Sequence, residues 1–271
     1  MAKTDKANRN LKRVVLIASE KGGVGKSVKA RALIDHLRSE GVKLAAYDAD
    51  GSVGALVRVL GTRTGDGRLA PQQDPVKGVG YYNVRADGER NTLLDAIASG
   101  DEIIVHDLAG GSLADLTRIV DGGEGLGGLL AAFGEHGYRL TIVHVISPEI
   151  GSAQSVARWI DLVGDHVDHI VVRNGRWGRS EADFPFWYGF TDGQGVSKGG
   201  KTREKLHALG GLEIDLPALP AGTYAKTDAE NMAFSAAAAD AALTITERAH
   251  IAKFRRDYAA ALEPARHLLG L

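Results

Sequence analysis

The 271-residue chain contains no cysteine. This absence excludes disulfide bonds, catalysis by a thiolate, and metal clusters held by cysteine. Long apolar runs are also lacking, since none approaches the roughly 20 residues that span a bilayer as a helix. The first residues are polar and basic, without the apolar core of a signal peptide. We therefore expect neither a membrane span nor a secretory leader.

An excess of charge of one sign is lacking as well. The 33 Lys and Arg residues nearly balance the 34 Asp and Glu residues, and the formal net charge is −1. Contact with nucleic acid or anionic lipid would therefore need a local basic patch. Residues 1–12 are rich in lysine and arginine. We predict that they form a flexible basic arm, which could touch DNA phosphates.

The chain is 44% hydrophobic, and short apolar runs alternate with segments of helical periodicity. Strands are expected near residues 13–19, 43–48, 79–85, 102–107, 139–146, 167–173 and 212–216. Helices are expected near residues 26–39, 52–60, 91–99, 112–119, 126–135, 150–163, 200–209, 227–236 and 239–262. This alternation predicts an α/β fold of three layers, a doubly wound and mostly parallel sheet with helices on both faces. We expect a single domain over 13–271, with loop insertions near 61–90 and 175–200.

Residues 20–27 read Glu-Lys-Gly-Gly-Val-Gly-Lys-Ser, a pattern typical of a phosphate-binding loop between a strand and a helix. Its glycines let successive N–H groups point inward, and the helix N-terminus adds partial positive charge. We predict that Lys26 reaches the β- and γ-phosphates and that the Ser27 hydroxyl ligates Mg²⁺. The alternative is a glycine-rich turn that binds nothing. The nucleotide-binding residues expected here are Gly22, Gly23, Val24, Gly25, Lys26, Ser27 and Val28.

A second lysine, Lys21, opens the same loop. One loop has room for only one lysine on its own phosphates, so the second indicates a charge aimed at a nucleotide in another subunit. Residues 21–27 resemble the deviant P-loop of the ParA/MinD family of ATPases. The resemblance implies a P-loop NTPase that binds ATP or ADP with Mg²⁺ and forms a homodimer in the ATP state. It also implies that Lys21 is a catalytic residue that crosses the dimer interface to the partner's phosphates.

The Asp48-Ala49-Asp50 segment resembles the Asp-x-Asp that ends the second strand in this family. The resemblance implies that Asp48 lies near the Mg²⁺ shell and that Asp50 orients the attacking water. A carboxylate at a strand end that faces the γ-phosphate suits that role. The alternative for each aspartate is a helix N-cap, and Asp50 could serve both purposes. Gly51 and Ser52 stand where the family commonly has proline, so we expect a more mobile switch loop.

Residues 103–111 form a short apolar run that ends in aspartate and a glycine pair, similar to a Walker B strand with switch II. Asp107 would hold Mg²⁺ through water, and the Gly110 N–H would sense the γ-phosphate. His106 is interpreted as a packed residue rather than a base. Asn174 matches the family's base-recognition asparagine, and Pro217 lies where related proteins hold the base with loop backbone. Either of these last two segments could instead be a plain turn.

Three further segments lie outside these motifs. Residues 61–90 are a glycine-rich, partly basic connection, either solvated or used for binding. Residues 175–200 hold much of the small aromatic content beside several arginines. They fit a protein interface, stacking on nucleic acid, or a small satellite core. The C-terminal helix, with Phe254 and Tyr258 on one face, is expected to pack on the core rather than bind a membrane.

The resemblance implies a slow, partner-stimulated ATPase that acts as a cytoplasmic switch and positions, partitions or transfers a cargo such as plasmid DNA or a DNA-bound complex. The narrower similarity is to plasmid stability and conjugative-transfer ATPases. The lack of cysteine argues against the iron–sulfur members of the wider family. Two alternatives stay open. One is a metabolic ligase or kinase of the same fold, similar to dethiobiotin synthetase or the cobyrinate amidation enzymes, and the other is a nucleotide-binding scaffold with negligible turnover.

Overall fold

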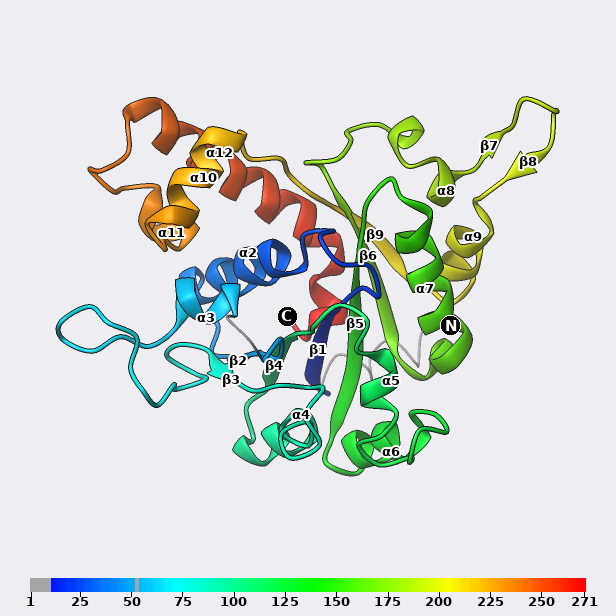
Figure 1. The fold of residues 1–271 in the computed structure, drawn as a ribbon, viewed down its shortest axis with the longest axis horizontal. Coiled ribbons are helices and arrows are strands. Elements are labelled where there is room, and N and C mark those ends of the chain that lie inside the picture. Colours follow the sequence, from blue (N-terminus) through cyan, green and yellow to red (C-terminus); the bar gives the residue numbers. More distant parts are fainter. Residues whose placement is uncertain (1–10, 52–53) are drawn as a thin grey trace.

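The computed structural model describes residues 11–51 and 54–271, so most of the basic arm predicted over 1–12 lies outside the described residues. Its centre is a seven-stranded parallel sheet (Figure 1). The strands are β1 (Lys12–Ala18), β2 (Ala45–Asp48), β3 (Gly80–Tyr81), β4 (Ile103–Asp107), β5 (Tyr138–Ile146), β6 (Asp168–Asn174) and β9 (Leu212–Leu216). Their order across the sheet is β3-β2-β4-β1-β5-β6-β9. The crevice at the carboxyl end of β1, between β4 and β5, is therefore the point where ligands bind in such sheets.

Helices cover both faces of the sheet because its strands are apolar on both sides. Val15 and Ile17 of β1 pack into one buried cluster, whereas Val14 and Leu16 pack into the other. The helices are α2 (Lys26–Ser39), α3 (Ala55–Leu60), α4 (Thr92–Asp95), α5 (Leu113–Leu116), α6 (Gly127–Glu135), α7 (Ile150–Val163), α8 (Pro185–Tyr188), α9 (Lys201–Ala208), α10 (Ala221–Ala229), α11 (Phe234–Ala237) and α12 (Ile245–Leu262). Helices α2, α11 and α12 lie on the first face, and α4, α6 and α7 contribute to the second (Figure 1).

The predicted fold class is confirmed, and each of the seven predicted strands corresponds to a strand of the sheet. Two helix predictions are wrong. The helix expected over 227–236 is interrupted, because Asn231 adopts a left-handed φ of 52° between α10 and α11. The helix expected over 239–262 begins later, where Thr244 and Glu247 form a capping box at the start of α12.

The aromatic segment near 175–200 builds a satellite core. Phe184 and Trp187 are buried against α7 and α9. The Trp187 Nε1 and the Tyr188 hydroxyl each donate a 2.9 Å hydrogen bond to Glu213 of β9. A hairpin of β7 (Phe190–Thr191) and β8 (Ser197–Lys198) extends beyond this core at the upper right of Figure 1. Trp177, which is 48% exposed, stays outside it, so most of the segment's rings serve packing.

The C-terminal helix packs on the core, as predicted. Ile251, Phe254, Tyr258 and Leu262 recur on one side of α12 and are all buried with α2 and β9. Within residues 11–51 and 54–271, no helix has both the length and the apolar content needed to cross a membrane.

Candidate active site

The glycine-rich loop connects β1 to α2 at the carboxyl edge of the sheet. Gly25 is the N-cap of α2 with a φ of 102°, a conformation that side chains rarely adopt. A Cβ there would also lie 2.4 Å from the Asn174 amide nitrogen. Gly23 has a φ of 77°. These glycines expose backbone N–H groups at the start of a 14-residue helix, which is a favourable position for phosphate.

Lys26 is buried among carboxylates at this position, with 8% of its surface exposed. Burial lowers the pKa of its ammonium group, and the nearby carboxylates of Asp107, Asp50 and Glu20 oppose that shift. A Cβ on Gly110 would lie 3.4 Å from the Lys26 Nζ. The structure therefore brings Lys26, Asp50, Asp107 and Gly110 together, as the sequence predicts.

The ends of β2 and β4 place two aspartates next to each other, since Asp48 and Asp107 are register partners in the parallel pair. Burial, and then the charge of Asp48, raise the pKa of Asp107 to about 7. The Ser27 hydroxyl is hydrogen-bonded to Asp107. The Asp107 Oδ1 is buried and has no hydrogen-bond partner among the residues that the structure describes.

This oxygen pair fits Mg²⁺. A hydroxyl and a carboxylate are hard ligands, and Mg²⁺ commonly uses one or two protein oxygens together with water and substrate phosphates. In the described part of the chain, no group of three His, Cys, Asp or Glu side chains could hold a metal ion by itself. Ser27 and Asp107 would therefore hold the ion together with the nucleotide, and its positive charge would neutralise the phosphates.

Asp48 holds the first turn of a helix, a role similar to the N-cap that was the alternative reading of this residue. Its Oδ2 accepts hydrogen bonds from the N–H groups of Leu56 and Val57, at 3.1 and 3.2 Å, in the first turn of α3. Its Oδ1 accepts from the Asp50 N–H at 3.2 Å. Both carboxylate oxygens thus hold the loop after β2, while the part in the Mg²⁺ shell stays a prediction.

Asp50 is on the outer side of the site and 54% of its side chain is exposed. Its Oδ1 lies 3.7 Å from Nη1 of Arg85, a residue that follows β3. The Arg85 Nη2 donates a 2.5 Å hydrogen bond to the Gly110 carbonyl. Arg85 was not predicted as a site residue. The available signal was a basic residue just beyond a strand end, in the long connection over 61–90.

Lys21 points to a different partner from Lys26. Its ammonium group lies 2.9 Å from the Glu149 carboxylate, and both side chains are about half exposed. Glu149 is the N-cap residue of α7. The two lysines of the loop therefore face separate environments, one buried and one at the surface.

His106 is packed in the core, as interpreted from the sequence. It is fully buried, stacks on Tyr47, and is hydrogen-bonded through Nδ1 to the Tyr82 hydroxyl at 3.0 Å. Burial lowers the pKa of His106 to about 3. A neutral, enclosed imidazole of this kind supports its neighbours and does not reach the site.

A cavity of about 610 Å³ adjoins the loop, a size within the range of about 300–1,000 Å³ typical of small-ligand pockets. Val28, Asn174, Pro217 and Asp228 are among its lining residues. The Asn174 amide nitrogen donates to the Val24 carbonyl at 2.7 Å, and its oxygen accepts from the Arg176 N–H at 3.0 Å. Asn174 thus supports the phosphate loop from beside the cavity, and its part in base recognition stays a prediction.

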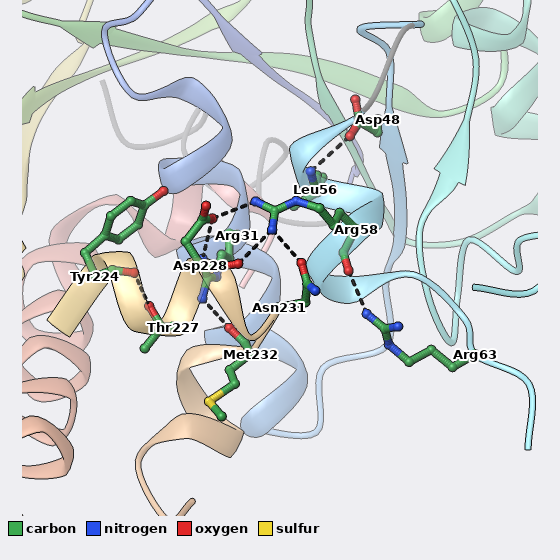
Figure 2. A network of polar contacts seen from close by, with 10 residues as sticks. All are labelled: Arg31, Asp48, Leu56, Arg58, Arg63, Tyr224, Thr227, Asp228, Asn231 and Met232. Atoms are coloured by element: carbon green, nitrogen blue, oxygen red, sulfur yellow. Dashed lines mark hydrogen bonds and ion pairs between the residues drawn. The ribbon is translucent and has the colours of Figure 1, made fainter. Parts of the chain in front are cut away.

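A network of polar contacts joins α3 to α10 (Figure 2), whose Asp228 lines this cavity. Arg58 of α3 donates to the Asp228 carbonyl at 2.7 Å and to its carboxylate at 2.8 Å. It also donates to the Asn231 side chain at 2.5 Å. The buried Arg31 of α2 lies 3.7 Å from the same Asp228 carboxylate. The helix that Asp48 holds at one end is therefore fastened to the cavity wall at the other.

Comparison with known proteins gives structural matches only. No protein-family model matches the chain, and no curated protein matches it. A ParA family ATPase from Chlorobium tepidum TLS aligns with a TM-score of 0.52 and 16% identity, over 93% of this chain and 99% of that one. A chain of the MinC:MinD cell division protein complex of Aquifex aeolicus gives a TM-score of 0.48 and 18% identity, over 92% of this chain and 96% of that one. MinD with Mg-ADP from Pyrococcus horikoshii OT3 gives 0.48 and 16%, over 93% and 98%. The first of these likenesses shows a shared fold.

Proposed function

We propose that the protein is an ATP-dependent molecular switch of the ParA/MinD type, which hydrolyses ATP to ADP and phosphate. The observation that carries this proposal is the convergence of Lys26, Ser27 and Asp107 beside a helix N-terminus at the carboxyl edge of the sheet. A buried ammonium group, a hydroxyl and an unpartnered carboxylate oxygen are the groups that bind a nucleoside triphosphate with Mg²⁺.

In this proposal the loop amides and Lys26 bind the β- and γ-phosphates, while Asp50 orients the attacking water. The Gly110 N–H reports the presence of the γ-phosphate to the segment after β4. The adjoining cavity accepts the nucleoside, with Val28, Asn174 and Pro217 along its walls. The whole of 13–271 would act as one P-loop domain, with 61–90 and 175–200 as its insertions.

The switch itself would be a homodimer that forms with ATP and separates after hydrolysis. Lys21 pairs with Glu149 at the surface, whereas Lys26 is buried beside Asp107, and this separation supports a role of Lys21 on the partner's phosphates. The ATP sites would then lie in the dimer interface. ATP hydrolysis would stay slow until a protein partner stimulates it.

The two lysines provide the test of this proposal. Lys26→Ala should weaken Mg-ATP binding by about 10-fold to 100-fold, as expected for loss of a charge-assisted contact. Lys21→Ala should keep most of the binding by the monomer and lose dimerisation. Calorimetric titration and sedimentation of each variant measure the two effects. Equal losses of binding in both variants would contradict the role of Lys21 in the partner's site.

The finer proposal concerns cargo. We infer that a cytoplasmic switch of this kind positions, partitions or transfers plasmid DNA or a DNA-bound complex, as in plasmid stability and conjugative transfer. Arg63 and Arg68 are exposed in the connection over 61–90, and the basic arm over 1–12 would add further charge. Gel retardation of DNA with ATP, at several salt concentrations, tests direct contact. Binding should weaken steeply as salt rises, and no retardation at the lowest salt would contradict it.

A further inference from the structure

One arginine spans the two loops at the outer edge of the candidate site. The Arg85 Nη2 donates a 2.5 Å hydrogen bond to the carbonyl of Gly110, which follows β4. Its Nη1 lies 3.7 Å from the carboxylate of Asp50, which follows β2. A single guanidinium group therefore lies across the region where the proposed γ-phosphate and attacking water would meet.

The backbone that carries this guanidinium is held firmly. The buried Val84 donates to the Ala49 carbonyl at 3.1 Å, beside the end of β2. The Arg85 N–H donates to the Asn83 side chain at 3.0 Å. Arg90, only 5% exposed, donates to the Arg85 carbonyl at 3.0 Å. The side chain thus starts from a fixed point, and rotation about its own bonds is enough to move the guanidinium.

The charge of Arg85 is not fully neutralised where it lies. Its contact with Asp50, at 3.7 Å, is longer than a charge-assisted hydrogen bond. Half of its side chain is exposed. The Lys26 Nζ lies beside the same Gly110, since a Cβ on that glycine would be 3.4 Å from it. Two cations directed at one place repel each other unless an anion lies between them, and a γ-phosphate would supply that anion.

We propose that Arg85 is a catalytic residue of the ATPase, an arginine finger supplied by the same chain. This inference rests on the proposed function. With ATP bound, the guanidinium donates to a γ-phosphate oxygen while it remains beside Asp50. The water oxygen forms a bond to the γ-phosphorus, and the bond from that phosphorus to the β–γ bridging oxygen breaks. The electron pair of that bond stays on ADP, and Asp50 accepts one water proton and releases it to solvent.

Arg85 stabilises the negative charge that grows on the γ-phosphate oxygens in this step. Lys21 of the partner subunit would add a third positive charge, besides Lys26 and Arg85, once the dimer forms. A purely structural role for Arg85 would be to fasten the Gly110 carbonyl and so hold the segment after β4. The two roles differ in what they affect, because fastening that segment would act on nucleotide binding and stability as well as on turnover.

The test is single-turnover ATP hydrolysis by the full chain and by Arg85→Ala, Arg85→Lys and Arg118→Ala. The Arg118 side chain is 58% exposed and lies 3.9 Å from Asp115, so it serves as a matched surface arginine. Arg85→Ala should lower the hydrolysis rate by about 100-fold or more, since arginine fingers contribute about 10³–10⁵-fold. Arg85→Lys should recover part of the rate, and Arg118→Ala should match the wild type.

A second readout separates catalysis from structure. ADP with aluminium fluoride resembles the transition state, so Arg85→Ala should lose affinity for that complex while its affinity for ADP stays within about threefold of the wild type. If the wild type hydrolyses ATP and Arg85→Ala does so at the same rate, the proposed role of Arg85 is overturned and the proposed function stands. An equal loss of ADP affinity and of hydrolysis rate would also overturn it, in favour of the structural role. No hydrolysis by the wild type in any single-turnover assay would contradict the proposed function as well.

Discussion

The ammonium group of Lys21 lies 2.9 Å from the Glu149 carboxylate, which joins the first residues of the phosphate loop to the start of α7. This pair holds Lys21 at the surface of its own chain. If Lys21 acts on the nucleotide of a partner, the pair must open before or during dimerisation. An exposed ion pair stabilises by only about 0–1 kcal/mol, so the contact is weak enough to be exchanged for a phosphate.

Glu149→Gln should therefore release Lys21 and favour the dimer. The dissociation constant of the ATP-bound dimer should fall by about two-fold to five-fold, which corresponds to the loss of a competing surface pair. Sedimentation at several protein concentrations measures it. Asp161→Asn is the control, because it removes a pair with Lys205 of similar exposure away from the loop. A weaker dimer in Glu149→Gln would show that Glu149 positions Lys21 for its partner.

The Arg58–Asp228 contacts should stabilise the fold (Figure 2). Arg58→Ala removes hydrogen bonds to Asp228 and Asn231, and we expect the free energy of unfolding to fall by about 1–3 kcal/mol. Urea denaturation measures the change. Arg63→Ala, which removes an exposed donor to the Arg58 carbonyl, should stay within about 0.5 kcal/mol of the wild type. Equal effects of the two substitutions would show that the network contributes little.

The close approach of Gly54 to Asp48 predicts a steric effect. A Cβ on Gly54 would lie 1.9 Å from the Asp48 Oδ2, and Asp48 is only 1% exposed. Gly54→Ala should therefore lower the free energy of unfolding by about 1–3 kcal/mol, the usual cost of overpacking. Gly134→Ala is the matched control, because Gly134 lies in α6 with no atom within 4 Å of a new Cβ. Thermal unfolding of both variants distinguishes crowding at Asp48 from a general effect of replacing glycine.

The burial of Lys29 should make the free energy of unfolding depend on pH. Its Nζ is fully buried, hydrogen-bonded to the Tyr258 hydroxyl at 2.6 Å, and burial lowers its pKa from 10.5 to about 7. Between these values the unfolded chain binds more protons than the folded chain. The contribution of Lys29 to the free energy of unfolding should therefore rise with pH across this window, by about 1.4 kcal/mol per pH unit.

Lys29→Met should flatten that dependence. Urea denaturation of the wild type and the variant, at pH values from about 7 to about 10, gives the difference between the two slopes. Lys43→Met, at a lysine whose side chain is 77% exposed, should leave the slope unchanged. Parallel curves for the wild type and Lys29→Met would mean that Lys29 keeps its ordinary pKa in the folded protein.

The sheet could be predicted because buried parallel strands read as continuous apolar runs, such as Ile103–Val105. The glycine-rich turn between β1 and α2 could be predicted because it connects an apolar run to a segment of helical periodicity, and its binding of phosphate stays a prediction. The boundary between α10 and α11 was missed because a single asparagine marks a helix end only weakly, although Asn231 does adopt the left-handed conformation here. The start of α12 had a visible signal, the Thr244 and Glu247 capping box, which the apolar periodicity outweighed.

Other site features depend on residues that are far apart in the chain. Arg85 meets Gly110 across 25 positions, and Lys21, which follows β1, meets Glu149, which follows the neighbouring strand β5. The apolar periodicity of the sequence does not indicate such contacts, because they depend on the geometry of the loops. Asp48 ends β2, where the strand prediction placed it, but the direction of its carboxylate toward the N–H groups of Leu56 and Val57 could not be read from the sequence.

The most direct test of the account is the mass of the protein in solution with ADP, with ATP, and with ATP bound to Asp50→Ala. Loss of the carboxylate that orients water should slow hydrolysis and preserve the ATP state. We predict a monomer with ADP and a stable dimer for Asp50→Ala with ATP. A monomer in all three conditions would contradict the central claim, that nucleotide binding and dimerisation share one site.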